Sequence, residues 1–77
     1  MNEKLETLIV PKDLGIFLGS YVDMIGDDSV TFYIIERLIN NYHSNNFKDE
    51  TRIFVNYYMT EISEVITGKR EYTIETK

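Results

Sequence analysis

Side chains that could catalyse a reaction are few and isolated in this chain. The single histidine, His43, falls in a predicted polar loop, residues 43–46, and the chain contains no cysteine. Acid–base and nucleophilic catalysis need two or more reactive side chains close together, for instance a base beside a nucleophile. None of the four serines has the Gly-x-Ser-x-Gly context of a hydrolase. We therefore interpret His43 as a solvated loop residue, and the sequence predicts no enzymatic activity and no cofactor.

Three aspartates, Asp23, Asp27 and Asp28, give the only hint of a metal site. In a calcium-loop frame that starts at Asp23, Asp28 occupies the position that requires glycine, and Ile34 occupies that of the bidentate glutamate. Thr67-Gly68-Lys69 matches only the end of a phosphate-binding loop and follows a predicted helix, whereas that motif follows a strand. The sequence thus predicts no metal site, and Asp27 and Asp28 are expected to cap a helix.

The hydrophobic pattern predicts an α+β fold with the order β-α-α-α-β, helix-dominated, in one domain of residues 1–77. Residues 5–10 end in β-branched side chains before a proline and predict a short strand. Residues 70–77 place Tyr72 and Ile74 on one side and polar residues on the other, which predicts a second strand. Because unpaired backbone groups are costly, these strands should pair with each other or with a second copy, and should lie across the helices.

Three helices are predicted between the strands. The first runs from Pro11 to Gly26, with an acidic first turn and a glycine stop. The second begins at Asp27 to Ser29, and the third runs from about Lys48 to Gly68. The predicted core stripes are Leu14, Phe17, Leu18, Tyr21 and Ile25 in the first helix, Phe32, Ile35, Leu38, Ile39 and Tyr42 in the second, and Ile53, Phe54, Tyr58, Ile62, Val65 and Ile66 in the third.

Negative charge is concentrated in the first half of the chain. Thirteen acidic and eight basic residues give a net charge of −5, with residues 1–38 at −4 and residues 39–77 at −1. No lysine or arginine occurs from Asp13 to Glu36. The sequence therefore places the negative field on the first two helices and the turn between them. It also argues against direct nucleic-acid binding, which calls for a basic patch.

The third predicted helix carries a second acidic row, in which Glu61 and Glu64 share one flank with Glu50 and Tyr57. Two such rows on either side of a groove would resemble the phosphates of a duplex, and the exposed tyrosines Tyr33 and Tyr57 would add contact area. A solvated acidic face is the simpler interpretation of the same pattern. The predicted partner-binding residues are Asp23, Asp27, Asp28, Tyr33, Glu36, Tyr57, Glu61 and Glu64.

In its general character the chain resembles the small acidic proteins that phages of low-GC Gram-positive bacteria make early in infection. The likeness rests on size, the lack of cysteine, the abundance of Ile, Tyr, Asn and Glu, and the stretch from Asp13 to Glu36 without basic residues. Several of those proteins are DNA mimics that occupy the DNA-binding surface of a host protein. The resemblance implies a host-takeover inhibitor whose partner is a host nucleic-acid-binding protein. It assigns no residue roles, and Lys69-Arg70 depart from a uniformly acidic surface.

The alternative function is a small regulatory or assembly module that associates through apolar contacts. Gly15 and Gly19 lie four residues apart on the first predicted helix, so one face there has little side-chain bulk. This face is expected to pack against a neighbouring element. In the alternative function, this face or a terminal strand forms a homodimer or an interface with a different protein. Apolar assembly would depend little on salt, whereas docking of an acidic face would weaken as salt rises.

The chain is expected to lie in the cytoplasm, away from membranes. Met1 to Lys4 lack the features of a secretory signal, and the longest apolar stretch, Leu14 to Ile25, is too short and too interrupted to span a bilayer.

Overall fold

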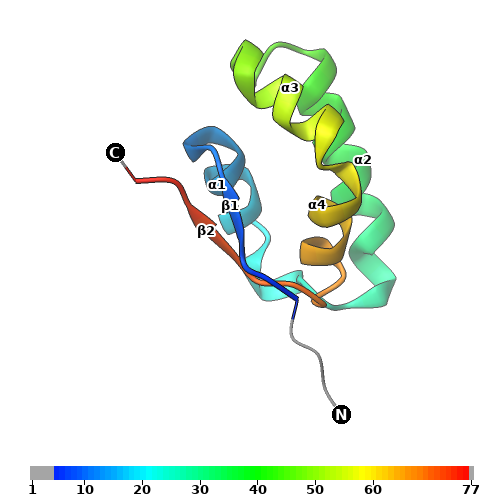
Figure 1. The fold of residues 1–77 in the computed structure, drawn as a ribbon. Coiled ribbons are helices and arrows are strands. Elements are labelled where there is room, and N and C mark those ends of the chain that lie inside the picture. The colour runs from blue at the N-terminus through cyan, green and yellow to red at the C-terminus, as the bar shows by residue number, and fades with distance from the viewer. Residues whose placement is uncertain (1–4, 77) are drawn as a thin grey trace.

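The computed structural model describes residues 5–76, so the predicted start at Met1 to Lys4 and the final residue of the second predicted strand, Lys77, lie outside it. The described part agrees with the predicted helix-dominated α+β class, although it contains four α-helices and not the predicted three (Figure 1). The elements are β1 (Leu8–Val10), α1 (Lys12–Gly19), the 3-10 helix η1 (Val22–Met24), α2 (Asp28–His43), α3 (Asp49–Tyr57), α4 (Met59–Ile66) and β2 (Tyr72–Ile74).

The two strands pair with each other in parallel, as a two-stranded ribbon within one chain. Leu8 is opposite Tyr72, and Val10 is opposite Ile74. Beyond β2, the amide of Glu75 donates to the carbonyl of Val10 at 2.8 Å. A parallel pair needs a long crossover, which α1 to α4 supply here. The predicted pairing within the chain is thus confirmed, with strands shorter than predicted.

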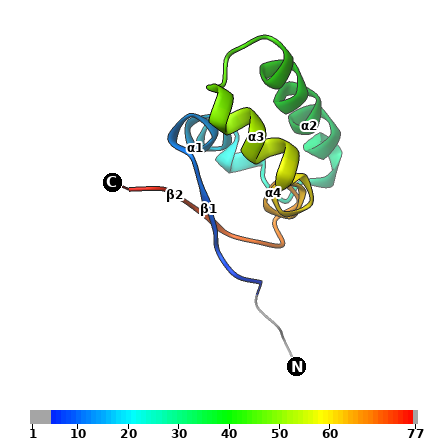
Figure 2. The same cartoon turned by 45° about the horizontal axis from the view of Figure 1, so that its top comes forward.

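The ribbon packs against the glycine-bearing face of α1 (Figure 2). A methyl group at Gly15 would overlap the side chain of Ile74, and the Tyr72 hydroxyl lies 3.9 Å from where a β-carbon on Gly19 would stand. Val10 is fully buried, Tyr72 is half-buried, and Ile74 is 37% exposed although it was expected in the core. The close neighbour predicted for this face is therefore β2 of the same chain.

Helix α1 ends at Gly19, seven residues before the predicted stop at Gly26. The amide of Ser20 bonds to the carbonyls of both Ile16 and Phe17, which tightens the last turn. The chain then passes through η1 to Gly26, whose φ of +92° suits glycine, and the Gly26 amide donates to the carbonyl of Ile66 at 3.1 Å. Gly26 thus ends the turn before α2 and joins it to the end of α4.

The third predicted helix is divided at Tyr58 into α3 and α4. Tyr58 has φ −113° and ψ 28°, outside the α-helical range, while the amide of Ile62 still donates to its carbonyl. Buried side chains continue in helical register across the break, from Thr51 and Val55 to Ile62, and Ile53 is 69% exposed despite its predicted core position. Because the apolar period does not change at Tyr58, periodicity alone predicted one helix.

Helix α2 packs against α4 on the side of the molecule away from the ribbon (Figures 1 and 2). Its buried side chains are Ile34 and Leu38, one turn apart. Phe32 and Ile39, which the predicted stripe placed in the core, are 77% and 45% exposed. The core face of α2 is therefore rotated from the predicted one, because Ile34 and not Phe32 packs inward.

The contact between Gly15 and Ile74 predicts that alanine at position 15 and alanine at position 19 change the free energy of unfolding differently. Gly15→Ala should lower the free energy of unfolding by about 1–3 kcal/mol, because the added methyl group forces the Ile74 side chain out of its position. Gly19→Ala meets only an ordinary van der Waals contact with the Tyr72 hydroxyl and should be neutral or stabilising by up to about 1 kcal/mol, since alanine favours a helix. Urea denaturation of both variants measures the difference. Equal effects would contradict the packing of Ile74 on Gly15, and Ile74→Ala should restore the stability of the Gly15→Ala variant.

Candidate protein-binding surface

The turn between η1 and α2 holds an aspartate that caps α2. Oδ1 of Asp27 accepts hydrogen bonds from the amide and the hydroxyl of Ser29, at 3.0 and 2.8 Å. These two bonds favour the ionised carboxylate and hold the pKa of Asp27 below its ordinary value of 3.8. The predicted capping role is confirmed for Asp27, and Asp28 occupies the first turn of α2, where negative charge complements the helix dipole.

Within residues 5–76, no ion pair neutralises the carboxylates around this turn. Among residues 5–76 the structure contains two ion pairs, Asp49 with Arg52 and Glu64 with Arg70. Neither pair involves the exposed carboxylates at the start and middle of α2 or in η1. We define the acidic patch as the four exposed carboxylates of this region: Asp23, Asp27, Asp28 and Glu36.

Exposed apolar side chains lie among these carboxylates. Phe32 is 77% exposed and stands one helical turn from Asp28 on one side and from Glu36 on the other. The predicted contact residue Tyr33 is 49% exposed, and its ring lies against that of Tyr21, with centroids 6.1 Å apart.

Phe32 was predicted in the core and not at the surface. The spacing of Ile34 and Leu38, one turn apart on another face of the helix, was the signal that could have found its exposure. Val22 and Met24 of η1 are also exposed.

The second predicted acidic row on α3 and α4 is partly neutralised. Oε1 of Glu64 accepts from Nη2 and Nε of Arg70 at 2.6 and 2.9 Å, and Nη1 of Arg70 donates to the carbonyl of Glu6. Glu64 is therefore a structural ion-pair partner that fastens the segment before β1 to α4, and not the free charge that was predicted. Glu61 is half-buried, whereas Tyr57 is 80% exposed with its ring against Tyr58.

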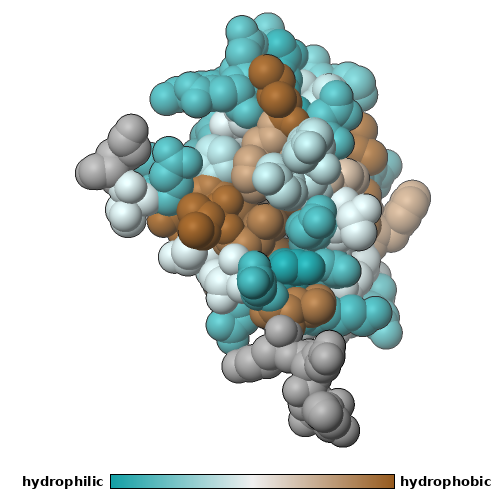
Figure 3. Space-filling model, in the orientation of Figure 1, coloured by the Kyte–Doolittle hydropathy of each residue, from teal (hydrophilic) through white to brown (hydrophobic). Residues whose placement is uncertain are grey.

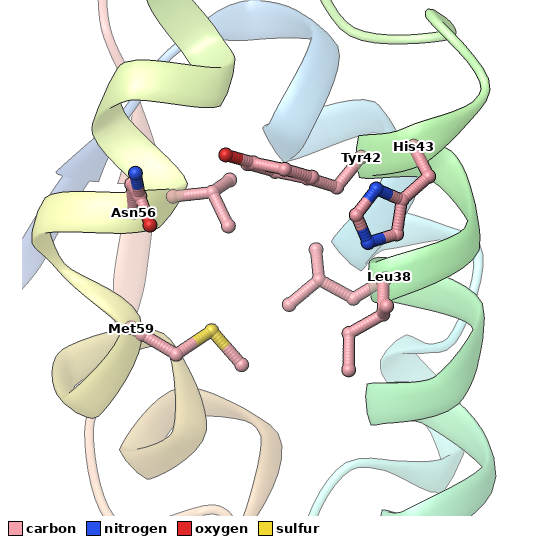
Figure 4. A pocket seen from close by; sticks show the side chains of 7 residues that line it. Leu38, Tyr42, His43, Asn56 and Met59 are labelled. Carbon is pink, nitrogen blue, oxygen red and sulfur yellow. The ribbon is translucent and has the colours of Figure 1, made fainter.

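A groove of about 320 Å³ lies between α2 and the junction of α3 and α4 (Figure 4). His43 belongs to the last turn of α2, not to the predicted loop, and its ring packs edge-on against Tyr42 with centroids 5.1 Å apart. The groove is mainly apolar and includes no carboxylate among its lining residues, so the predicted acidic rows do not face each other across it. Its lining consists of Leu38, Ile39, Tyr42, His43, Val55, Asn56 and Met59.

Asp13, the first carboxylate of the stretch without basic residues, ties α1 to α3. Its carboxylate accepts from the Thr51 hydroxyl at 2.6 Å, from the Lys48 amide at 2.9 Å and from the Leu14 amide at 3.0 Å. Burial alone would raise the pKa of Asp13, but these hydrogen bonds outweigh it and the pKa lies below the ordinary 3.8. Asp13 therefore acts in the fold and adds little to the contact surface.

Asp13 predicts a pH-dependent contribution to stability. Its pKa is lower in the folded than in the unfolded state, so the contribution is complete above the unfolded pKa of about 4 and is lost as pH falls through the folded pKa. Asp13→Asn should lower the free energy of unfolding at pH 7 by about 1–3 kcal/mol, because an amide cannot accept all three bonds. Urea denaturation should show this deficit shrinking below about pH 4. The exposed Asp23→Asn is the control, and an equal loss in both variants would refute the assignment.

Within residues 5–76, no three histidine or acidic side chains are grouped so that they could hold a metal ion. No helix in this part of the chain combines the length and hydrophobicity needed to cross a membrane. On the face seen in Figure 3, apolar side chains gather over the ribbon, where Ile9 and Ile74 are exposed. This patch, the acidic patch and the groove between α2 and the α3–α4 junction are three candidate surfaces for binding a partner.

Comparisons of this chain with protein-family models, with curated proteins and with solved structures gave no match.

Proposed function

We propose that this protein is a non-enzymatic inhibitor that docks its acidic patch on the basic, DNA-binding surface of a nucleic-acid-binding protein. One observation carries the proposal. Among residues 5–76, four exposed carboxylates lie outside both ion pairs, and two of them, Asp28 and Glu36, stand one helical turn before and after Phe32, which is 77% exposed.

The charges support fast, salt-dependent encounter with a basic partner. Unpaired carboxylates on one surface attract a cationic surface over a distance that salt shortens, so steering raises the association rate mainly at low ionic strength. Asp27 is ionised across the physiological range, and its hydrogen bonds with Ser29 lower its pKa further and hold the carboxylate at the start of α2. Asp28 and Glu36 are eight residues apart on α2, about 12 Å along the helix axis. They present fixed negative charges to cations that would otherwise hold a nucleic-acid backbone.

The exposed aromatic side chains support a protein partner. Large aromatic residues contribute most of the energy of many interfaces, and a tyrosine adds a polar tip with little ordering cost. Phe32 and Tyr33 fit these roles, and Val22 and Met24 of η1 are also exposed. The carboxylates would raise the association rate by electrostatic steering, and the aromatic contacts would lower the dissociation rate.

The setting of this function follows the resemblance to early phage proteins. An inhibitor of this kind would be phage-encoded and would act in the cytoplasm of the host, with no cofactor and no contact with membranes. The competing module that associates through the glycine face of α1 is less favoured, because Ile74 and Tyr72 of the same chain lie against that face.

Removing the charges of the acidic patch should abolish capture of the partner. The test variant carries Asp23→Asn, Asp27→Asn, Asp28→Asn and Glu36→Gln, and asparagine at position 27 preserves the helix cap. The charge-matched control carries Asp49→Asn, Glu50→Gln, Glu71→Gln and Glu75→Gln, so both proteins have the same net charge. Each is used for affinity capture from a lysate of a low-GC Gram-positive bacterium at low and moderate salt.

The wild type and the control should retain a basic nucleic-acid-binding protein at low salt, and the test variant should lose it by roughly tenfold or more. Purified wild type should then displace duplex DNA from that protein in a fluorescence competition assay. If the test variant and the control capture the same proteins equally, the acidic patch is not the binding surface. If the captured protein keeps its DNA, inhibition by occupation of the DNA site is wrong.

A further inference from the structure

Helix α2 carries a second apolar stripe besides the one that packs in the core. The core stripe uses Ile34 and Leu38. The outer stripe consists of side chains spaced by three, four and three residues, which is the heptad spacing of helix-packing seams. We call this outer stripe the α2 seam, defined as Phe32, Ile35, Ile39 and Tyr42.

The α2 seam is only half covered by the rest of the chain. Ile35 and Tyr42 are partly buried against the core, whereas Phe32 is 77% and Ile39 is 45% exposed. A surface helix normally shows one apolar stripe and an opposite polar face, so a second stripe leaves apolar area that only another molecule can bury.

The seam continues into the groove between α2 and α3. Ile39 and Tyr42 line that groove from α2, and Val55 and Met59 line its other wall (Figure 4). The volume of about 320 Å³ accommodates side chains and not a whole helix. An incoming helix would therefore lie along the seam and place anchor side chains between Tyr42 and Met59.

We propose that the occupant of this surface is a basic amphipathic helix of the partner protein, packed lengthwise against the α2 seam with an apolar anchor in the groove. The inference rests on the proposed function, because it specifies which part of the basic partner the acidic surface recognises. Helix-in-groove recognition of this kind uses apolar anchors that recur every three or four residues.

The charges beside the seam select a cationic helix. Asp28 stands one turn before Phe32 at the start of the seam, and Glu36 flanks its middle. Helical spacing puts Arg37, the only lysine or arginine of α2, on the opposite side of the helix. A partner helix with lysines or arginines beside its apolar seam meets two carboxylates and no cation from α2.

The same charges disfavour a second copy of this chain as the occupant. Two copies would each bring a net charge of −5, and would bury the carboxylates of α2 against one another. The apolar patch on the ribbon has less preference for a cationic partner, because the groove beside it is bordered by two lysines, Lys12 and Lys48, as well as by the carboxylates of Asp13, Glu50 and Glu75.

Two synthetic peptides test the inference. The seam peptide is a helix of about 18 residues, or five turns, with leucine at the two core positions of each heptad and lysine at the flanking positions. The shuffled peptide has the same composition and charge but no continuous leucine seam. Fluorescence anisotropy measures the affinity of each labelled peptide for the intact protein.

Two double variants locate the binding site. Phe32→Ser with Ile39→Ser removes the exposed side of the seam, and Ile9→Ser with Ile16→Ser removes similarly exposed apolar area elsewhere. Because all four side chains are at least 45% exposed, both proteins should keep their helix content by circular dichroism. The seam peptide should bind the wild type and the ribbon-side variant alike, and should bind the seam variant at least about tenfold more weakly, a loss of about 1.4 kcal/mol.

Methyl-¹³C methionine labelling distinguishes the groove from the acidic patch. Met59 lines the groove, and Met24 lies in η1 beside Asp23. The seam peptide should shift the Met59 methyl resonance, with Met24→Leu and Met59→Leu variants giving the assignments. Affinity for the shuffled peptide should be at least about tenfold lower.

Three results would overturn the inference. Equal binding of both peptides, with shifts at Met24 but not at Met59, would refute helix docking on the α2 seam. The same result would still agree with binding at the acidic patch, as in the proposed function. Failure of both peptides to bind would likewise refute helix docking, while the capture experiment would still decide the proposed function. Sedimentation that shows a dimer of the wild type, lost in the seam variant, would assign the seam to a second copy of this chain.

Discussion

The packing of Ile74 directly on Gly15 is the constraint on which the arrangement of this molecule depends. The absence of a side chain at Gly15 lets β2 approach α1 closely, and this approach brings the two ends of the described chain into one parallel ribbon. Parallel pairing requires everything between the strands to form a crossover. The helices must therefore pack on one side of the ribbon, with Val10 and Leu14 at the centre of the contact.

Three further contacts hold the helices to one another and to the segment before β1. Asp13 joins the start of α1 to the start of α3 through Thr51. The Gly26 amide bonds to the end of α4, and Arg70 joins the end of α4 to the segment before β1. Each of these contacts uses a polar group that would otherwise be solvated, and none of them lies on the outer side of α2. The charged groups and the glycine face near the ribbon are therefore engaged in contacts within the chain, whereas α2 keeps exposed side chains without such contacts.

The binding surface follows from what the fold leaves unpaired. Among the described residues, arginines neutralise Glu64 and Asp49, whereas the carboxylates of η1 and α2 are in neither ion pair. Because α2 turns Ile34 inward, Phe32 and Ile39 remain outside, next to those carboxylates. Charge and apolar area thus coincide on one element. This coincidence suits a partner that is both basic and amphipathic, whereas a uniformly acidic surface would suit any cation.

The sequence by itself determined the helix-dominated α+β class, the points where α1, α2 and α3 begin, and most of the core. Proline and capping residues mark those starts, and the buried side chains of α1 and α4 all belong to the predicted stripes, since propensity and periodicity act over a few neighbouring residues. The predicted end of the first helix at Gly26 was wrong, because α1 ends at Gly19. Only the tertiary structure decided which stripe of α2 faces inward, where the long helix breaks at Tyr58, and that Arg70 neutralises Glu64. Arg70 and Glu64 are only six residues apart, but Arg70 also bonds to the carbonyl of Glu6 at the other end of the chain, and that contact exists only in the folded molecule. The spacing of Ile34 and Leu38 offered an inward face of α2 beside the predicted one, and packing against α4 decided between them.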